Sequence, residues 1–447
     1  MRSRYNVSVL VCACLTLVWG ATTILSVPSC TPAPSSGDGD GGGGDGGGGD
    51  DGGGTAEKAY VGAETCSDCH GGTHTDWVTT AHAEALEALK AIGQGENAAC
   101  LPCHTVGFGE TDGFVDEVTT PELAGVQCEN CHGPAGDHSR NPGDELVRPT
   151  IDMSAAKCGS CHTDVHHPTY DEWQLSKHGT ALAGLQSSAF AQDSCLECHS
   201  QDYRFAVEEQ EDGDDDIVVP TILTATLSIE CATCHDPHGG TGQEAQLNAP
   251  IADLCGECHT QEEATIGDSP HHPQIEMLTG AGAFAADASP LTVPFSPHSS
   301  LAAEGGQACA QCHVVQHEFD DPTEATPNVT GHTFNPFDES IASEHQASQY
   351  TGCLQCHGTE DVADGKRTEV QADMDARLAA LAPYFDSTNA SYIDATTLSE
   401  ADQASLATAK FDYQFVNADG SRGVHNAEYA DAALSVAESV IAALSGG

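Results

Sequence analysis

The sequence predicts a mainly α-helical fold with much irregular structure, in which short helices and loops wrap round a contiguous stack of bound groups. Three observations lead to this prediction. The pattern Cys-x-x-Cys-His occurs nine times between Cys66 and His357, and aromatic residues make up only 5% of the chain. Roughly 32 residues per motif are too few for a separate hydrophobic core round each one. After the last motif, alanine-rich stretches without cysteine predict a helical cap.

Each Cys-x-x-Cys-His motif has the spacing that attaches a c-type haem. Two thiols three positions apart lie on one side of a helical turn and can bond to the vinyl groups of one porphyrin, and the histidine that follows binds the iron. Zinc knuckles and disulfide frameworks also repeat Cys-x-x-Cys, but neither needs a histidine directly after the second cysteine. We therefore expect a multihaem cytochrome c with nine covalently attached haems c.

The motifs are numbered 1 to 9 in chain order. Their cysteines are Cys66 and Cys69, Cys100 and Cys103, Cys128 and Cys131, Cys158 and Cys161, Cys195 and Cys198, Cys231 and Cys234, Cys255 and Cys258, Cys309 and Cys312, and Cys353 and Cys356. The expected proximal iron ligands are His70, His104, His132, His162, His199, His235, His259, His313 and His357.

The distal position of each iron is left to the fold, and histidine or methionine commonly fills it. The chain has only four methionines, whereas fourteen of its 23 histidines lie outside the motifs. This count permits two histidines at every iron, which predicts low reduction potentials. We expect the distal ligands to be His82, His138, His178, His238, His298, His332 and His425, with one or both members of the His166/His167 and His271/His272 pairs, from which His167 and His271 are chosen. The expected spares are His74, His317 and His345.

The first thirty residues predict an export signal. Arg2 and Arg4 precede a mostly apolar run over residues 7–25, as in secretory signals. The run leads into Val27-Pro28-Ser29-Cys30, which resembles the lipobox of bacterial lipoproteins, so we expect a membrane lipid anchor at Cys30. Ordinary secretory cleavage and an uncleaved anchor helix are the alternatives. All three place the haem region outside the cytoplasm, in the periplasm or at the outer membrane and cell surface.

Composition divides the chain into four parts. Residues 1–30 are the predicted signal, and residues 31–58 contain thirteen glycines and five aspartates in one tract, which predicts a flexible tether. Residues 59–360 are the predicted nine-haem domain. Residues 361–447 form the predicted helical segment, which is too short to bury much surface by itself and is expected to pack on the haem domain.

The charge of the chain restricts its partners. There are 68 acidic residues against 14 basic ones, which gives a formal net charge of −54. Such a surface repels nucleic acid and anionic lipid headgroups and favours redox partner proteins with basic surfaces. Solubility alone is an equally good reason for the charge. The sequence leaves open whether the chain assembles into an oligomer or a filament.

Two elements occur twice in the chain. One is Trp77-x-x-Thr80-x-His82, repeated at Trp173-x-x-Ser176-x-His178, and the other is His166-His167-Pro168, repeated at His271-His272-Pro273. These repeats suggest the duplication of a smaller multihaem unit. The irregular spacing of the nine motifs argues against a solenoid of identical repeats.

Further elements adjoin the motifs. They are Tyr60-Val61-Gly62, Cys128 to Pro134 with His138, Cys158 to His162, Cys231 to His238, Gly331-His332-Thr333-Phe334 and Gly423-Val424-His425-Asn426. Together with the repeated elements they resemble multihaem cytochromes of the hydroxylamine-oxidoreductase superfamily, particularly its electron-transfer members. The resemblance implies parallel and perpendicular haem pairs in close contact, with distal histidines at His82, His138, His178 and His238.

Departures from that family bear on function. The Cys-x-x-Cys-Lys motif of its nitrite-reducing members does not occur, and nothing marks a tyrosine for the haem crosslink of its hydroxylamine-oxidising members. The favoured function is therefore an electron carrier without catalytic residues, working between a membrane donor and an external or periplasmic acceptor. The alternative is an oxidoreductase in which one five-coordinate haem acts on a nitrogen or sulfur compound, with Arg140, Arg148 and Arg204 as the few candidate arginines.

Overall fold

The computed structural model describes residues 59–446, apart from residues 212, 214–216, 262–263, 294–295, 304–307, 320–322, 324–326 and 337–349. The predicted export signal, Cys30, the glycine/aspartate tract and His345 lie outside these residues. Within the described part, all regular secondary structure is helical, and β-type pairing is confined to isolated bridges. The predicted fold class, mainly helical with much irregular structure, is confirmed.

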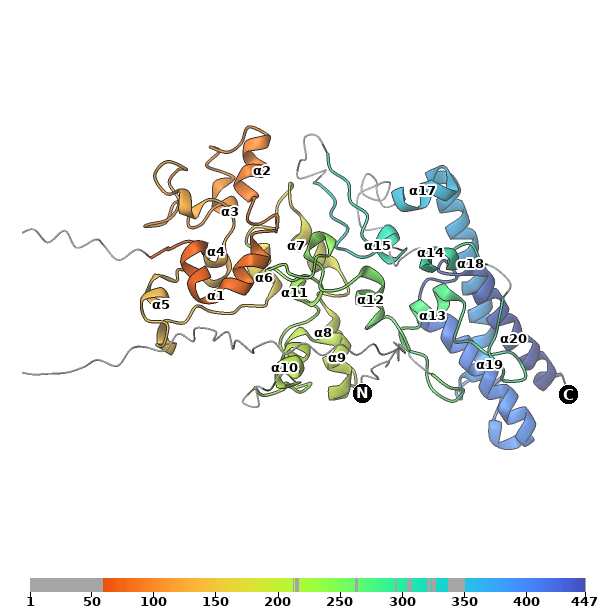
Figure 1. The fold of residues 1–447 in the computed structure, drawn as a ribbon. Helices are drawn as coiled ribbons and strands as arrows, with labels where there is room; N and C mark the ends of the chain where they lie inside the picture. The colour runs from red at the N-terminus through yellow and green to blue at the C-terminus, as the bar shows by residue number, and fades with distance from the viewer. Residues whose placement is uncertain are drawn as a thin grey trace, which may run out of the picture. The chain divides into compact units, whose positions relative to one another are not determined.

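The helices of the motif-bearing region are short, and many of them contain part of a motif (Figure 1). Each motif needs about one helical turn to place both thiols on one side, so little chain is left for longer elements. These helices are α1 (Ala63–Trp77), α2 (Ala85–Ala91), α3 (Leu101–His104), α4 (Cys128–His132), α5 (Gly136–Arg140), α6 (Ala155–Gly159), α7 (Thr169–Leu175), α8 (Ala181–Gln186), α9 (Leu196–His199), α10 (Gln201–Glu211), α11 (Cys231–Cys234), α12 (Ile251–Gly256), α13 (Gln274–Thr279), α14 (Ser299–Ala303), α15 (Ala308–His313) and α17 (Thr351–His357). The 3-10 turns are η1 (Pro121–Leu123), η2 (Glu145–Val147), η3 (Asp193–Cys195), η4 (Glu244–Gln246) and, further on, η5 (Ala395–Thr397).

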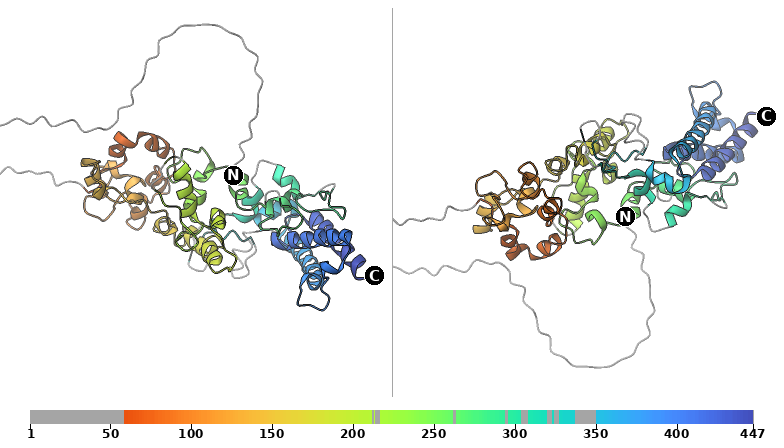
Figure 2. Two further views of the ribbon diagram at one scale, coloured as in Figure 1. Left: turned by 90° about the horizontal axis from the view of Figure 1, so that it is seen from below. Right: turned by 90° about the horizontal axis from the view of Figure 1, so that it is seen from above.

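Three long helices follow the last motif and pack side by side (Figure 2). They are α18 (Glu360–Phe385), α19 (Glu400–Asp419) and α20 (Ala427–Ser445). Each begins at a residue whose side chain accepts a hydrogen bond from a backbone N–H of the first turn, which satisfies one of the free donors there. These capping residues are Thr359, Ser399 and Asn426.

The largest apolar core of the described chain lies among these three helices. Phe411, Phe415 and Tyr429 are almost fully buried in it. Met277 of α13 and Ala283 after it belong to the same core, so the bundle packs on the motif-bearing region. The apolar clusters within that region are smaller. One lies at motif 2 round Leu101, and another lies at motif 5 round Leu196.

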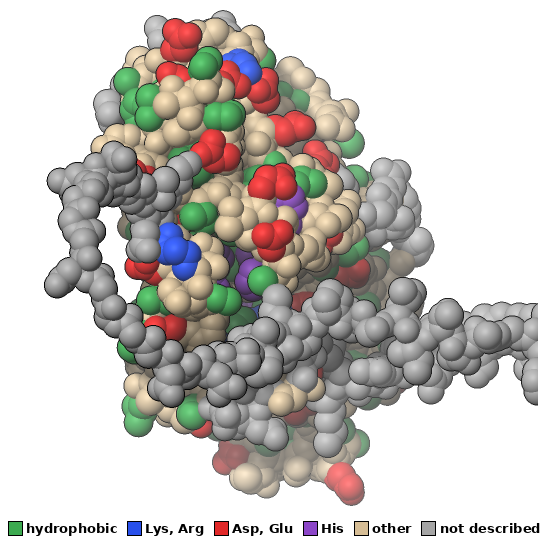
Figure 3. Space-filling model, turned by 60° about the vertical axis from the view of Figure 1, so that its left-hand side comes forward, with side chains coloured by type: hydrophobic (Ala, Val, Ile, Leu, Met, Phe, Trp, Pro, Cys, Tyr) green, Lys and Arg blue, Asp and Glu red, His purple; other side chains and the backbone are tan. Residues whose placement is uncertain are grey.

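The surface is predominantly acidic. In the view of Figure 3, acidic side chains are spread over the face and basic ones are sparse, while histidines are visible in a recess near the centre. No helix in the described part is both long enough and apolar enough to cross a membrane.

Candidate haem sites

Eight of the nine motif histidines face a second histidine. Two imidazoles bound to opposite sides of one iron, with metal–nitrogen bonds of about 2 Å, have ring centres roughly 6 Å apart. The observed ring-centre separations are 6.4 Å for His104 and His167, 6.2 Å for His132 and His238, 6.0 Å for His162 and His82, 6.2 Å for His235 and His332, 6.0 Å for His259 and His178, 6.1 Å for His313 and His425, and 6.3 Å for His357 and His298. His199 faces both His271, at 6.4 Å, and His272, at 5.9 Å.

Hydrogen bonds orient many of these rings. The Nδ1 atom of His104 lies 2.9 Å from the carbonyl oxygen of Ala85, and that of His298 lies 2.6 Å from the carbonyl of Val424. A carbonyl accepts only, so the proton sits on Nδ1 and the Nε2 lone pair remains free for iron. The same type of contact is made by His132, His199, His235, His313 and His332, to the carbonyl oxygens of Thr150, Ala181, Ala245, Phe334 and Thr330.

Burial keeps several paired rings neutral. Desolvation lowers the pKa of His162, His178 and His332 to about 4. Neutral imidazole is the form that binds metal, so this shift favours ligation at neutral pH. The separations, the orientation of the rings and the lowered pKa of His162, His178 and His332 fit haem iron held between two histidines.

His425 has a different environment. Its Nδ1 atom lies 2.6 Å from Oδ1 of Asp419, a buried carboxylate that also accepts from the Ser421 hydroxyl. Burial of the ring lowers the pKa of His425, but the hydrogen bond and the charge of Asp419 outweigh this effect, and the net shift is upward. A carboxylate on Nδ1 makes the ring more basic as a ligand through Nε2. The C-terminal bundle thus supplies both a candidate ligand and the group that polarises it.

Contacts between cysteines of different motifs show which motifs are neighbours. Side chains interact directly between motifs 1 and 3, 2 and 4, 4 and 6, 5 and 7, and 7 and 8, through Cys66 and Cys128, Cys103 and Cys161, Cys158 and Cys231, Cys198 and Cys258, and Cys255 and Cys309. Cysteines of motifs 3 and 4, 6 and 7, and 8 and 9 lie near enough for the charge of one to raise the pKa of the other, without a direct contact, in the pairs Cys131 and Cys158, Cys234 and Cys255, and Cys312 and Cys353. The motifs therefore follow one another in the order 1, 3, 4, 6, 7, 8, 9, with motif 2 beside motif 4 and motif 5 beside motif 7.

Comparison with known proteins also identifies haem-binding sequences in this chain. Residues 65–133 match the family model described as cytochrome c554 and c-prime, and residues 227–264 match the model of a doubled CXXCH motif. Cytochrome c-554 of Nitrosomonas europaea is 31% identical over 138 residues, which cover 24% of this chain and 59% of that protein. The multiheme cytochrome MtrA of Shewanella baltica is 25% identical over 287 residues, which cover 58% of this chain and 76% of that protein. The chain belongs to the multihaem c-type cytochromes.

The fold of this multihaem cytochrome is also found in a solved structure. The crystal structure of the outer cell wall cytochrome OcwA superposes with a TM-score of 0.61 and 22% identity, covering 86% of this chain and all of that one. The likeness supports the fold. The family matches cover motifs 1–3 and motifs 6 and 7, and they identify the Cys-x-x-Cys-His motif of this multihaem cytochrome as a haem c attachment site.

Arg204 joins two haem motifs of the cytochrome. Its Nη1 atom donates to the carbonyl oxygen of Glu197 in motif 5 at 3.0 Å and lies 3.9 Å from the sulfur of Cys258 in motif 7. Its Nη2 atom forms an ion pair with Glu257. One of the few cations of the region therefore joins motif 5 to motif 7.

Two residues of the predicted set are not paired in the structure. Among the described residues, no histidine ring faces His70, the motif 1 histidine, and none faces His138 on α5. The Nδ1 atom of His138 is buried and has no hydrogen-bond partner among the described residues. The predicted spare His74 packs against Trp77, with ring centres 5.5 Å apart, and the predicted spare His317 packs against Phe319 at 4.5 Å.

The sequence prediction chose one residue where the structure offers two. The sequence prediction names His271 at motif 5, but His272 lies nearer to His199 and is the less exposed of the two. The repeated His-His-Pro element carries a signal for His272. In its first copy, His166-His167-Pro168, the predicted ligand is the second histidine, and the second histidine of the other copy is His272.

Proposed function

We propose that this cytochrome carries electrons along nine haems between a membrane donor and an external or periplasmic acceptor. The observation that carries the proposal is the set of eight facing histidine pairs at about 6 Å. An iron with two imidazole ligands has no open position, so its chemistry is limited to a change of oxidation state. Two imidazoles also favour ferric iron and low potentials.

The proposed distal ligands are His82, His167, His178, His238, His298, His332 and His425, with one member of the His271/His272 pair at motif 5. For motif 1 we propose His138, the remaining member of the predicted set. Its helix is tied to the segment that enters α1: the N–H of Gly136 donates to the carbonyl oxygen of Ala59 at 2.9 Å. The Glu129 carboxylate accepts from the N–H groups of both Val61, at 3.0 Å, and Ala135, at 2.8 Å.

Spin state tests this proposal. Electron paramagnetic resonance of the oxidised holoprotein, whose intact mass should correspond to nine haems, is expected to show low-spin ferric haem alone. Added cyanide, nitrite or hydroxylamine should leave the spectrum unchanged. A high-spin signal that responds to one of these ligands contradicts the all-saturated assignment. The variant His138→Ala should create such a signal, whereas the matched variant His74→Ala should not.

The order of the motifs suggests the path of the electrons. The line 1, 3, 4, 6, 7, 8, 9 would form the main route, with the haems of motifs 2 and 5 at its side. Removing the attachment cysteines Cys231 and Cys234 of motif 6 should interrupt conduction between the two ends of an electrode-bound protein. Removing Cys195 and Cys198 of motif 5 should leave most of the conduction intact. Mass spectrometry should show eight haems in both variants. An equal loss of conduction in the two variants would contradict this order.

The location of the protein is part of the same proposal. The apolar leader and Cys30, the lipobox-like match and the name of the outer cell wall relative support an extracytoplasmic lipoprotein. Redox partners with basic surfaces would suit its acidic surface. The repeated Trp-x-x-Ser/Thr-x-His elements support a place near the hydroxylamine-oxidoreductase superfamily. Cys30→Ala should release the protein from the membrane fraction, and unchanged fractionation would contradict the anchor.

A second function is favoured by one observation: among the residues that the structure describes, no histidine ring faces His70. If His138 does not bind the iron of motif 1, that haem would be five-coordinate and could bind a small nitrogen or sulfur compound. The wild-type spectrum distinguishes the two functions, because only the second predicts a ligand-sensitive high-spin signal before any mutation. Loss of that signal in His70→Ala would assign it to motif 1.

A further inference from the structure

The regions of motifs 1–3 and 4–6 make the same hydrogen bonds at corresponding positions. The indole N–H of Trp77 donates to the carbonyl oxygen of Val126 at 3.1 Å, two residues before motif 3. The indole N–H of Trp173 donates to the carbonyl oxygen of Ile229 at 2.8 Å, two residues before motif 6. These contacts span 49 and 56 residues, so they do not follow from local sequence.

Two further contacts correspond in the same way. The backbone N–H of Ala63, three residues before motif 1, donates to the side chain of Gln127 at 2.7 Å. The N–H of Ala155, three residues before motif 4, donates to Glu230 at 2.7 Å. The side chain directly before motif 3 or motif 6 therefore fixes the helix that starts the same unit.

The histidines that face the next unit also correspond. His82 faces His162 of motif 4 with ring centres 6.0 Å apart and planes at 60°. His178 faces His259 of motif 7 at 6.0 Å and 60°. Each unit thus places one imidazole against the first motif of the unit that follows.

The two His-His-Pro elements can be compared on this basis. His167 lies 6.4 Å from His104 of motif 2, at 47°, and 6.5 Å from His162 of motif 4, at 76°. His272 lies 5.9 Å from His199 of motif 5, at 50°. It also lies 5.7 Å from His259 of motif 7, at 83°. The second histidine of each element therefore stands in the same relation to two motif histidines.

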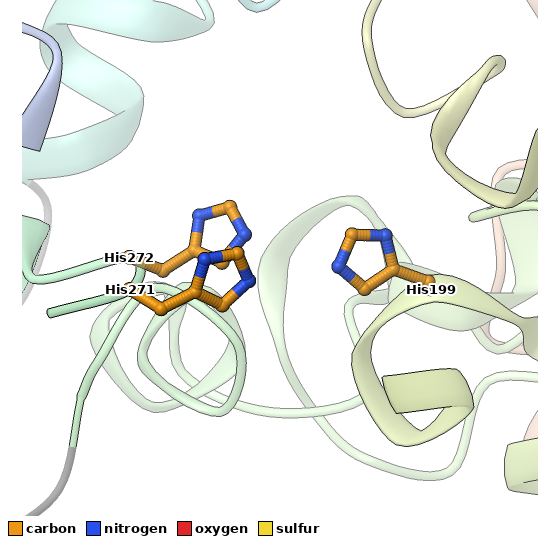
Figure 4. Close-up of side chains that lie close together, drawn as sticks. All are labelled: His199, His271 and His272. Carbon is orange, nitrogen blue, oxygen red and sulfur yellow. The ribbon is translucent and has the colours of Figure 1, made fainter. Parts of the chain in front are cut away.

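The first histidine of each element shows no such correspondence. His271 lies 6.4 Å from His199 with the rings at 16°, while His166 faces no motif histidine in the described chain. Figure 4 shows His271 and His272 next to each other, with His199 opposite. Ligand nitrogens of all three lie within 4.8 Å of one another, but one of them is a proximal haem ligand, so a separate metal ion would compete with haem.

The backbone of His272 is also unusual. Its φ of 56° lies in the left-handed region, which is unfavourable for a residue other than glycine. Next to it, Pro273 is buried, and the N–H of Ile275 donates to the carbonyl oxygen of His259 at 3.1 Å. The corresponding N–H of Tyr170 donates to His162 at 2.9 Å. This anchored turn directs the second histidine between two motifs.

We infer that motifs 1–3 and 4–6 are two copies of one three-haem unit, and that the duplication makes His167 and His272 the distal ligands of motifs 2 and 5. His166 and His271 are neighbours of these ligands and do not bind iron. The inference rests on the proposed bis-histidine ligation and names the residue that supplies it at motif 5.

The test uses four variants of the full-length holoprotein: His272→Ala, His271→Ala, His167→Ala and His166→Ala. Electron paramagnetic resonance is recorded on the oxidised protein, and carbon monoxide binding on the reduced protein. His272→Ala and His167→Ala should each gain one high-spin haem that binds carbon monoxide. His271→Ala and His166→Ala should keep the wild-type spectra. A new high-spin signal in His271→Ala, or none in His272→Ala, overturns the assignment.

A second variant covers loss of the cofactor. If His272→Ala contains eight haems by mass, His272→Met keeps a ligand of another type and should raise the potential of one haem relative to wild type. An unchanged set of potentials in His272→Met would overturn the assignment as well. Failure of the proposed function is seen separately, since it appears as a ligand-sensitive high-spin signal in the wild-type protein.

Discussion

The motif-bearing region and the C-terminal bundle are stabilised in different ways. In the bundle, α18, α19 and α20 bury a continuous apolar core made mainly by their own side chains, to which Met277 and Ala283 are added. The motif-bearing region has short helices, small apolar clusters and many contacts from side chains to distant backbone groups. The difference is what we expect of a chain whose covalently attached porphyrins supply much of the apolar interior. Four changes test this contrast, starting with the largest expected effect.

The largest effect should follow from preventing haem attachment altogether. Without haem, amide hydrogens of residues 59–357 should exchange with solvent at once, because the chain there has little core of its own. Amides of α18, α19 and α20 should remain protected. Hydrogen exchange with mass spectrometry, with the holoprotein as control, measures both regions in one sample. Equal exchange in the two regions would show that the bundle also depends on haem.

Next in size is the loss of a core side chain from the bundle. Phe415 is fully buried against Phe411 and Tyr429, and Phe415→Ala should lower the free energy of unfolding by about 3–5 kcal/mol. Because the bundle holds His425 against His313, heating this variant should make one haem high-spin before the others change. Circular dichroism and optical spectra follow the two events. The exposed Val362→Ala variant is the control and should melt like wild type.

A pH effect of similar size is expected from one buried carboxyl in the bundle. Burial raises the pKa of Asp412 to about 7, and its Oδ1 atom accepts from the N–H of Phe284 at 2.9 Å. A raised pKa means that the folded state binds the proton more tightly, so stability is highest at low pH and falls as the pH rises toward 7. The loss should be up to about 4 kcal/mol.

Asp412→Asn keeps the acceptor oxygen and removes the charge. This variant should therefore melt at a higher temperature than wild type at pH 8, and the advantage should shrink toward pH 4. Thermal unfolding over this range measures the difference. An advantage that does not vary with pH would contradict the raised pKa of Asp412, because the folded and unfolded states would then bind the proton equally.

The smallest effect should come from the carboxylate behind His425. Asp419→Asn keeps a hydrogen-bond acceptor for Nδ1 but removes the negative charge that makes the ring a stronger ligand. The potential of one haem should rise while the spin state stays low, which spectroelectrochemical titration can detect. The matched variant Asp431→Asn, on the bundle surface beside Arg377, should leave all potentials unchanged.

Much of the cytochrome could be predicted from the sequence, because its strongest signals are local. The nine motifs follow from spacing within five residues, and the helical fold class follows from composition and alanine content. The facing pairs depend on contacts between distant segments. His132 and His238 lie 106 positions apart and His313 and His425 lie 112 apart, so no local pattern could match them. The order of the motifs in space was hidden for the same reason.

The forward placement of His82 and His178 has a consequence for how such chains change in length. Under the proposed ligation, each three-haem unit completes an iron in the unit that follows, so neighbouring units would interlock and a single unit would not be self-sufficient. If motifs 4–6 were deleted as one block, His82 would meet His259 where His178 stood before. Gain or loss of whole units would preserve the register of ligands, whereas gain or loss of a single motif would disturb it. Evolution by steps of three haems would therefore require the least redesign.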